Sequence, residues 1–102
     1  MTYADSTQRA AFIGGLRSLA DYLESNPEVP APAYATTIVH TFPPHGEWAE
    51  MCTEIDATAA RLGVTAHLTD GGHYVAARSF GPVEYCSLAI PPKSDSDTEE
   101  SE

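Results

Sequence analysis

The stretch from Val64 to Ile90 constrains the fold more than any other part of the chain. Asp70-Gly71 favours a type I′ hairpin turn, and Gly81-Pro82 is an equally strong turn signal. Between and around these turns, apolar and polar residues alternate in three segments, at positions 64–69, 73–80 and 83–90. The pattern therefore predicts an antiparallel meander of three strands.

If each turn has two central residues, the alternation assigns the side chains of the meander to two faces. The first face is apolar and is expected to form the core: Val64, Ala66, Leu68, Val75, Ala77, Cys86, Leu88 and Ile90. The second face is mixed: Thr65, His67, Tyr74, Ala76, Arg78, Phe80, Val83, Tyr85 and Ser87. In this register Arg78 lies across from Tyr85, and Tyr74 lies across from His67. A slip of one residue in either hairpin would exchange the two faces.

The first half of the chain predicts two helices and one strand. Residues 6–25 have helical periodicity, with Asp5 or Ser6 as N-cap and Asn26-Pro27 as the end, although Gly14-Gly15 weakens the helix. One side of this helix gathers apolar residues, namely Phe12, Leu16, Leu19, Ala20 and Leu23. A proline-rich connector, a β-branched strand at 34–42 and a second helix at 46–62 follow. Gly63 is the expected left-handed terminator of that second helix.

These elements predict an α/β (α+β) fold of order α-β-α-β-β-β, a two-layer sandwich with a mixed four-stranded sheet and a C-terminal antiparallel meander. The strands at 34–42 and 64–69 are expected to run parallel if they share the sheet. Two arrangements of the helices remain open. Both helices pack on the apolar face and leave the other face open, or the first helix covers the second face and buries Phe80, Val83 and Tyr85.

Charge and composition limit the classes of partner. The chain has 102 residues and a net charge of −10. We expect one domain over residues 1–93 and a disordered acidic tail over residues 94–102, since the tail has no apolar side chain. An acidic field disfavours direct contact with nucleic acid and with anionic membranes. With no targeting segment and no apolar run of bilayer length, a cytoplasmic location is the expectation.

No pattern of catalytic, cofactor-binding or metal-ligating residues is recognisable. His40, His45, His67 and His73 are scattered over predicted strands and a loop, and a site formed by His73 with Cys86 or Glu84 is less favoured than a half-buried strand histidine. No serine lies in a nucleophile-elbow motif. Cys52 lies among acidic residues, which raise the pKa of a thiol. We therefore expect a protein that is not an enzyme, needs no cofactor and holds no metal.

Two surfaces are candidates for binding. The first is the aromatic and arginine side of the meander: His67, Tyr74, Arg78, Phe80 and Tyr85. Aromatic residues with an arginine are enriched at protein interfaces, so this set predicts contact with a protein, either a second copy of the chain or another partner. The second is an acidic row on the second helix, formed by Glu47, Glu50 and Glu54. Such a row resembles the phosphates of DNA but is more typical of a solvated helix face.

The segments 11–23, 27–30 and 72–85 together resemble a group of small hypothetical proteins of actinobacteria and their phages or integrative elements. This resemblance implies an accessory role in a phage or mobile-element setting and assigns no catalytic residue. The preferred hypothesis is a non-enzymatic accessory protein that acts by protein–protein binding. The alternative is an acidic, DNA-mimic-like inhibitor of a nucleic-acid enzyme, and a small hydrolase or metal-dependent enzyme is less favoured.

Overall fold

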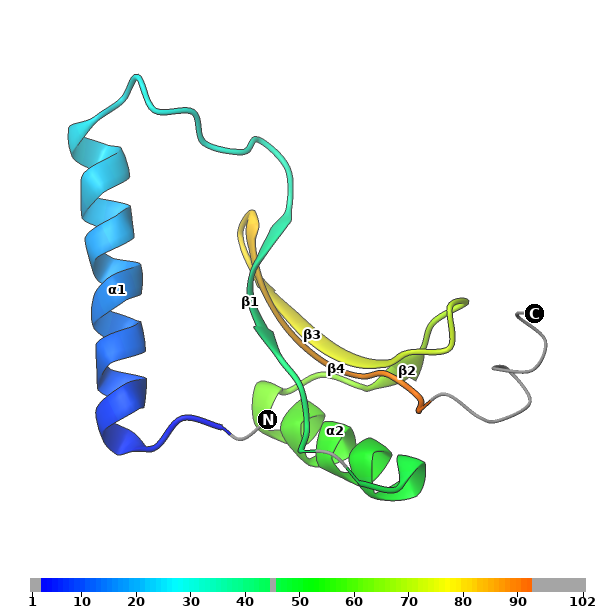
Figure 1. Ribbon diagram of the computed structural model, residues 1–102. Coiled ribbons are helices and arrows are strands. Elements are labelled where there is room, and N and C mark those ends of the chain that lie inside the picture. The colour runs from blue at the N-terminus through cyan, green and yellow to red at the C-terminus, as the bar shows by residue number, and fades with distance from the viewer. Residues whose placement is uncertain (1–2, 45, 93–102) are drawn as a thin grey trace, which may run out of the picture.

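A computed structural model describes residues 3–44 and 46–92, so the tail predicted at 94–102 lies outside the described residues. The described chain forms two helices and four strands in the predicted order (Figure 1). They are α1 Ser6–Ser25, β1 Thr36–Thr41, α2 Trp48–Leu62, β2 His67–Leu68, β3 Tyr74–Phe80 and β4 Val83–Ala89. The predicted α+β fold with a mixed four-stranded sheet and a C-terminal meander is confirmed.

The strands form one sheet of order β1-β4-β3-β2. β1 pairs with β4 in parallel, whereas β4 with β3 and β3 with β2 are antiparallel pairs. β1 and β2 therefore run parallel, as expected, but they lie at opposite edges of the sheet. The connection from β1 through α2 to β2 therefore crosses from one edge of the sheet to the other. The last strand, β4, lies between β1 and β3 as an inner strand.

The two hairpins of the meander differ in how well the sequence predicted them. In the β3–β4 hairpin Phe80 pairs with Val83 and Arg78 with Tyr85, as a two-residue turn requires. In the β2–β3 hairpin the predicted register is wrong by one residue, because His67 pairs with Val75 and Leu68 with Tyr74. The physical reason is a turn of three residues, in which Gly72 has a φ of 87° and the Thr69 amide donates to the His73 carbonyl at 2.8 Å.

Helix α2 supplies most of the core. It ends at Gly63, which adopts the predicted left-handed conformation with a φ of 75°. Met51, Ile55 and Ala59 are buried on its sheet-facing side. They pack against Ala76 of β3 and Ala89 of β4, with Trp48, Leu62, Val64, Ala66 and Tyr74 partly buried around them.

The face of the sheet on which α2 packs is not the predicted one. Ala76, Ser87 and Ala89 are at most 1% exposed beneath α2, and they belong to the face that carries Tyr74, Arg78 and Tyr85. Small side chains let a helix approach the strands closely, and here Ile55 fills the space above them. The predicted core face with Val75, Ala77, Cys86 and Leu88 is the opposite one, and no helix among the described residues packs on it.

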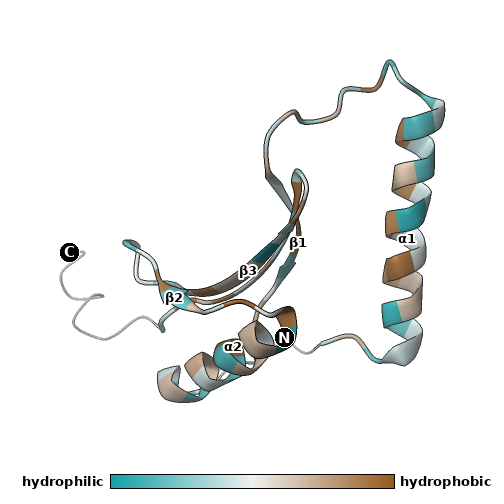
Figure 2. Ribbon diagram, turned by 180° about the vertical axis from the view of Figure 1, so that it is seen from behind, coloured by the Kyte–Doolittle hydropathy of each residue, from teal (hydrophilic) through white to brown (hydrophobic). Residues whose placement is uncertain are grey.

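Helix α1 is fully formed but stands apart from the sheet (Figure 1). Asp5 is its N-cap, in a capping box with Gln8, and Asn26 ends it, as predicted. No Cα atom of α1 lies within 8 Å of a Cα atom in another described helix or strand. None of its residues is buried, so the prediction that its apolar side packs on the sheet of the same chain is wrong. Figure 2 shows the hydrophobic positions that this leaves along α1.

Candidate functional site

The structure brings four of the five predicted binding residues together. Tyr74, Arg78 and Phe80 alternate along β3, and Tyr85 lies across from Arg78 on β4, so the four side chains share the face of the sheet that carries α2. His67 lies beside Val75 on the opposite face, because of the altered register of the first hairpin. The fifth residue is therefore separated from the others by the sheet itself.

Tyr74 and Arg78 are tied to α2 by hydrogen bonds. The Tyr74 hydroxyl donates to Asp56 Oδ1 at 2.6 Å, and this hydrogen bond, more than burial, raises the pKa of Tyr74 above its ordinary value. The Arg78 guanidinium donates to the Leu62 carbonyl at 3.1 Å, at the helix C-terminus, where a positive charge is favoured by the helix dipole. These two residues therefore help to fix α2 on the sheet.

The end of the sheet beyond α2 leaves aromatic side chains less covered. Phe80 is 54% exposed and lies under the Arg78 guanidinium, whose central carbon is 5.1 Å from the ring centroid. Tyr85 is half-buried, and its hydroxyl lies 3.1 Å from Thr41 Oγ1 of β1. Here the sheet presents large apolar surface to the space between the two helices.

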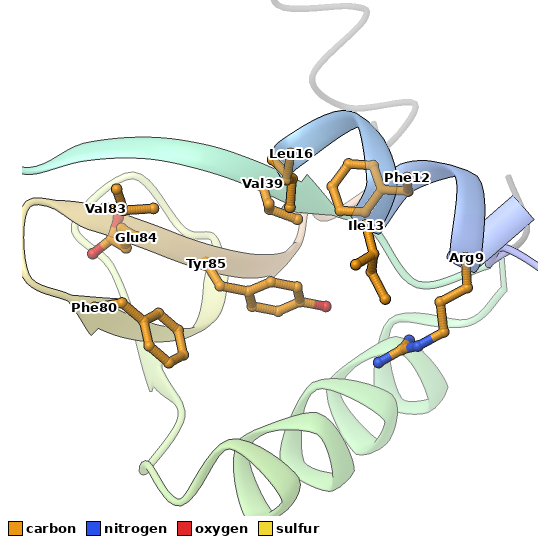
Figure 3. A pocket seen from close by; sticks show the side chains of 9 residues that line it. All are labelled: Arg9, Phe12, Ile13, Leu16, Val39, Phe80, Val83, Glu84 and Tyr85. Carbon is orange, nitrogen blue, oxygen red and sulfur yellow. The ribbon is translucent and has the colours of Figure 1, made fainter. Parts of the chain in front are cut away.

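That space is a groove of about 280 Å³ between α1 and the sheet (Figure 3). One wall is the apolar side of α1 and the other is the end of β1, β3 and β4. Its lining consists of Arg9, Phe12, Ile13, Leu16, Val39, Phe80, Val83, Glu84 and Tyr85. Figure 3 shows Phe12, Ile13 and Leu16 on α1 and Val39, Phe80, Val83 and Tyr85 on the strands. We call these two surfaces the helix wall and the sheet wall.

The helix wall is the part of the site that sequence reasoning missed. Two of its residues, Phe12 and Leu16, belong to the predicted apolar stripe, which was assigned to the core by analogy with ordinary amphipathic helices, whereas Arg9 and Ile13 were not part of that stripe. Phe12 is 48% exposed and Leu19 is 47% exposed, whereas Ile55 on α2 is 0% exposed. Two signals could have distinguished the helices: the Gly14-Gly15 pair and the proline-rich connector that follows α1.

The remaining histidines and cysteines lie on separate elements of the described part of the chain. Within residues 3–44 and 46–92, no three His, Cys, Asp or Glu residues are grouped as metal ligands would be. His40 stacks on Phe42, with ring centroids 6.1 Å apart, and His45 lies outside the described residues. Burial raises the pKa of both thiols, with a further contribution from Asp56 at Cys52 and from Glu84 at Cys86. Both cysteines are therefore held in the protonated, weakly nucleophilic form.

Comparison of the chain with protein-family models, with curated proteins and with solved structures gave no match. Among the described residues, neither helix has the combination of length and apolar character that crossing a membrane requires. The function proposed below is therefore based on the groove and its two walls.

Proposed function

We propose that the chain is a non-enzymatic protein-binding module whose contact surface is formed by the helix wall and the sheet wall. The observation that carries this proposal is the exposure of large apolar side chains on both walls: Phe12, Ile13, Phe80 and Val83 are between 38% and 54% exposed. Contiguous exposed apolar surface of this kind is typical of interaction sites.

The composition of the walls favours a protein partner. Phe12, Phe80 and Tyr85 offer large aromatic area at small cost in side-chain entropy, Arg9 supplies positive charge in the groove, and the Arg78 guanidinium lies over the Phe80 ring. Aromatic residues and arginine are the types that dominate binding energy at protein interfaces. A nucleic-acid partner would call for a positive field, and the chain carries a net charge of −10.

The same surface agrees with the accessory, protein-binding role that we expect from the resemblance to small hypothetical proteins of phages and mobile elements. The alternative of an acidic inhibitor is supported by Glu47, Glu50 and Glu54, which are all exposed on α2. We favour the groove because Glu50 already serves the helix start, where it accepts a hydrogen bond from the Glu47 amide at 3.2 Å.

Paired serine substitutions on the two walls test this function. Phe12→Ser and Phe80→Ser remove exposed rings outside the core, so each is expected to leave the chain folded and to weaken partner binding at least about tenfold. Tyr34→Ser is the matched control, since Tyr34 is 85% exposed and lies outside the groove. Binding is measured as retention of the same partner protein from lysate on each immobilised variant. Equal retention by all three variants would contradict the proposed function.

A further inference from the structure

We infer that the partner at the groove is a second copy of this chain, and that each copy places its α1 on the sheet wall of the other. This inference rests on the proposed function, because it uses the same two walls. It adds the identity of the partner and the form of the assembly, a dimer with exchanged helices.

Helix α1 requires a surface that its own chain does not provide. It has 20 residues, none of them buried. A side chain added at Gly14 or Gly15 would meet no atom within 4 Å, so no close packing offsets the two helix-weakening glycines. In proteins, most of the stability of a helix comes from packing of its apolar face rather than from intrinsic propensity. A stable α1 therefore implies that its stripe is covered in solution.

Both walls are largely apolar, and the charged residues that line them, Arg9 on the helix wall and Glu84 on the sheet wall, are of opposite sign. Phe12, Leu16, Leu19 and Leu23 recur at helical spacing on one side of α1, and no acidic residue interrupts that side. The sheet wall presents Val39, Phe80, Val83 and Tyr85. Each chain carries a net charge of −10, but the apolar stripe of α1 contains no acidic residue. Its contact with the sheet wall of a second copy therefore places no carboxylate of the stripe on that wall.

The connector between α1 and β1 sets the helix apart from the sheet of its own chain, across the groove. Pro27, Pro30 and Pro32 lie within six residues, and the Val29 amide donates to the Asn26 carbonyl at 2.9 Å in a turn directly after α1. Proline fixes φ and holds the preceding residue extended, so such a segment is a semi-rigid spacer. Figure 1 shows it carrying α1 away from the sheet. A helix held out in this way can reach a partner without bending its connector.

The contact area is sufficient for a stable dimer. A helix of 20 residues is about 30 Å long and about 10 Å wide, so one side covers on the order of 300 Å². Two reciprocal contacts, counted on both partners, bury on the order of 1,200 Å², which reaches the range of specific interfaces. Because each copy gives and receives one helix, a two-fold axis closes the assembly and limits it to two chains.

Cross-linking between differently labelled copies tests this inference on the full chain. In a background with Cys52→Ser and Cys86→Ala, a tagged copy carries Leu16→Cys and an untagged copy carries Val39→Cys. The two are refolded together and treated with a short bis-maleimide. We expect a tagged–untagged product of twice the 10.9 kDa chain mass. The control pairs Val39→Cys with Ser18→Cys, which lies on the other side of α1, and should give at least about tenfold less product.

Either of two other results would contradict the inference that the partner is a second copy. If one chain carrying both cysteines cross-links only to itself, and the mixed copies give no product, α1 closes on its own sheet. If neither sample cross-links and light scattering gives the mass of one chain, α1 does not bind a sheet wall of this protein. In both cases the proposed function is judged separately, because Phe12→Ser and Phe80→Ser still report on binding of other proteins.

Discussion

The hydroxyl of Tyr74 lies 2.6 Å from a carboxylate oxygen of Asp56, and this hydrogen bond joins β3 to α2 beside the core. It predicts a pH-dependent stability. The bond and burial raise the pKa of Tyr74 above 10.0, so the native state holds its proton more tightly than the unfolded chain does. The stabilisation is complete below pH 10.0 and is lost as pH rises through the raised native pKa.

Tyr74→Phe checks this assignment. The free energy of unfolding should fall less steeply with pH above 10.0 in Tyr74→Phe than in the wild type, as measured by urea denaturation at a series of pH values. Tyr34→Phe, at an exposed tyrosine outside the sheet, should keep the wild-type slope. Because burial also raises the pKa of Tyr3, Cys52 and Cys86, part of the slope should remain in Tyr74→Phe. Identical slopes in Tyr74→Phe and the wild type would refute the assignment.

Ile55→Ala is expected to lower the free energy of unfolding by about 2–5 kcal/mol, because it leaves a cavity between α2 and the sheet. Ile55 is 0% exposed and faces Ala76 and Ala89, which cannot fill the space. Ile90→Ala is the control, since Ile90 is 50% exposed and should change stability by less than about 0.5 kcal/mol. Equal, small effects of the two substitutions in denaturant unfolding would show that α2 is not packed at this position.

Ser87→Ala is expected to be neutral or stabilising by about 1 kcal/mol. Ser87 is 0% exposed in β4, and its hydroxyl has no hydrogen-bond partner among the described residues. Removing an unpaired buried polar group relieves its desolvation cost. Thermal unfolding of the variant measures the change, and a fall in the midpoint of several degrees would mean that the hydroxyl is paired in solution.

The sequence was sufficient for the elements and insufficient for their packing. Local signals determine the ends of α1 at Asp5 and Asn26, the end of α2 at Gly63 and the β3–β4 turn, because each depends on residues within a few positions. The β2–β3 register failed because Asp70-Gly71-Gly72 is compatible with a turn of two or three residues. Only the latter uses Gly72 in the left-handed conformation.

The choice of sheet face failed for a different reason. Alternation separates the two faces but does not say which one a helix covers, and both faces of this meander contain apolar residues. The decisive feature is local: Ala76, Ser87 and Ala89 form a strip of small side chains that accepts α2, whereas the larger residues of the same face, Phe80 and Tyr85, lie beyond the helix. The groove was missed because the apolar residues of α1 resemble an ordinary core stripe, and the Gly14-Gly15 pair and the proline-rich connector hint at an unpacked helix without giving its position.

The measurement that tests the account most directly is amide hydrogen exchange of α1 as a function of protein concentration. If α1 lies on the sheet wall of a second copy, its amides should exchange slowly at high concentration and faster on dilution, while those of α2 stay protected throughout. In Phe12→Ser, the amides of α1 should lose their protection at a higher protein concentration than in the wild type. Exchange of α1 that does not depend on concentration, whether fast or slow, would contradict the account.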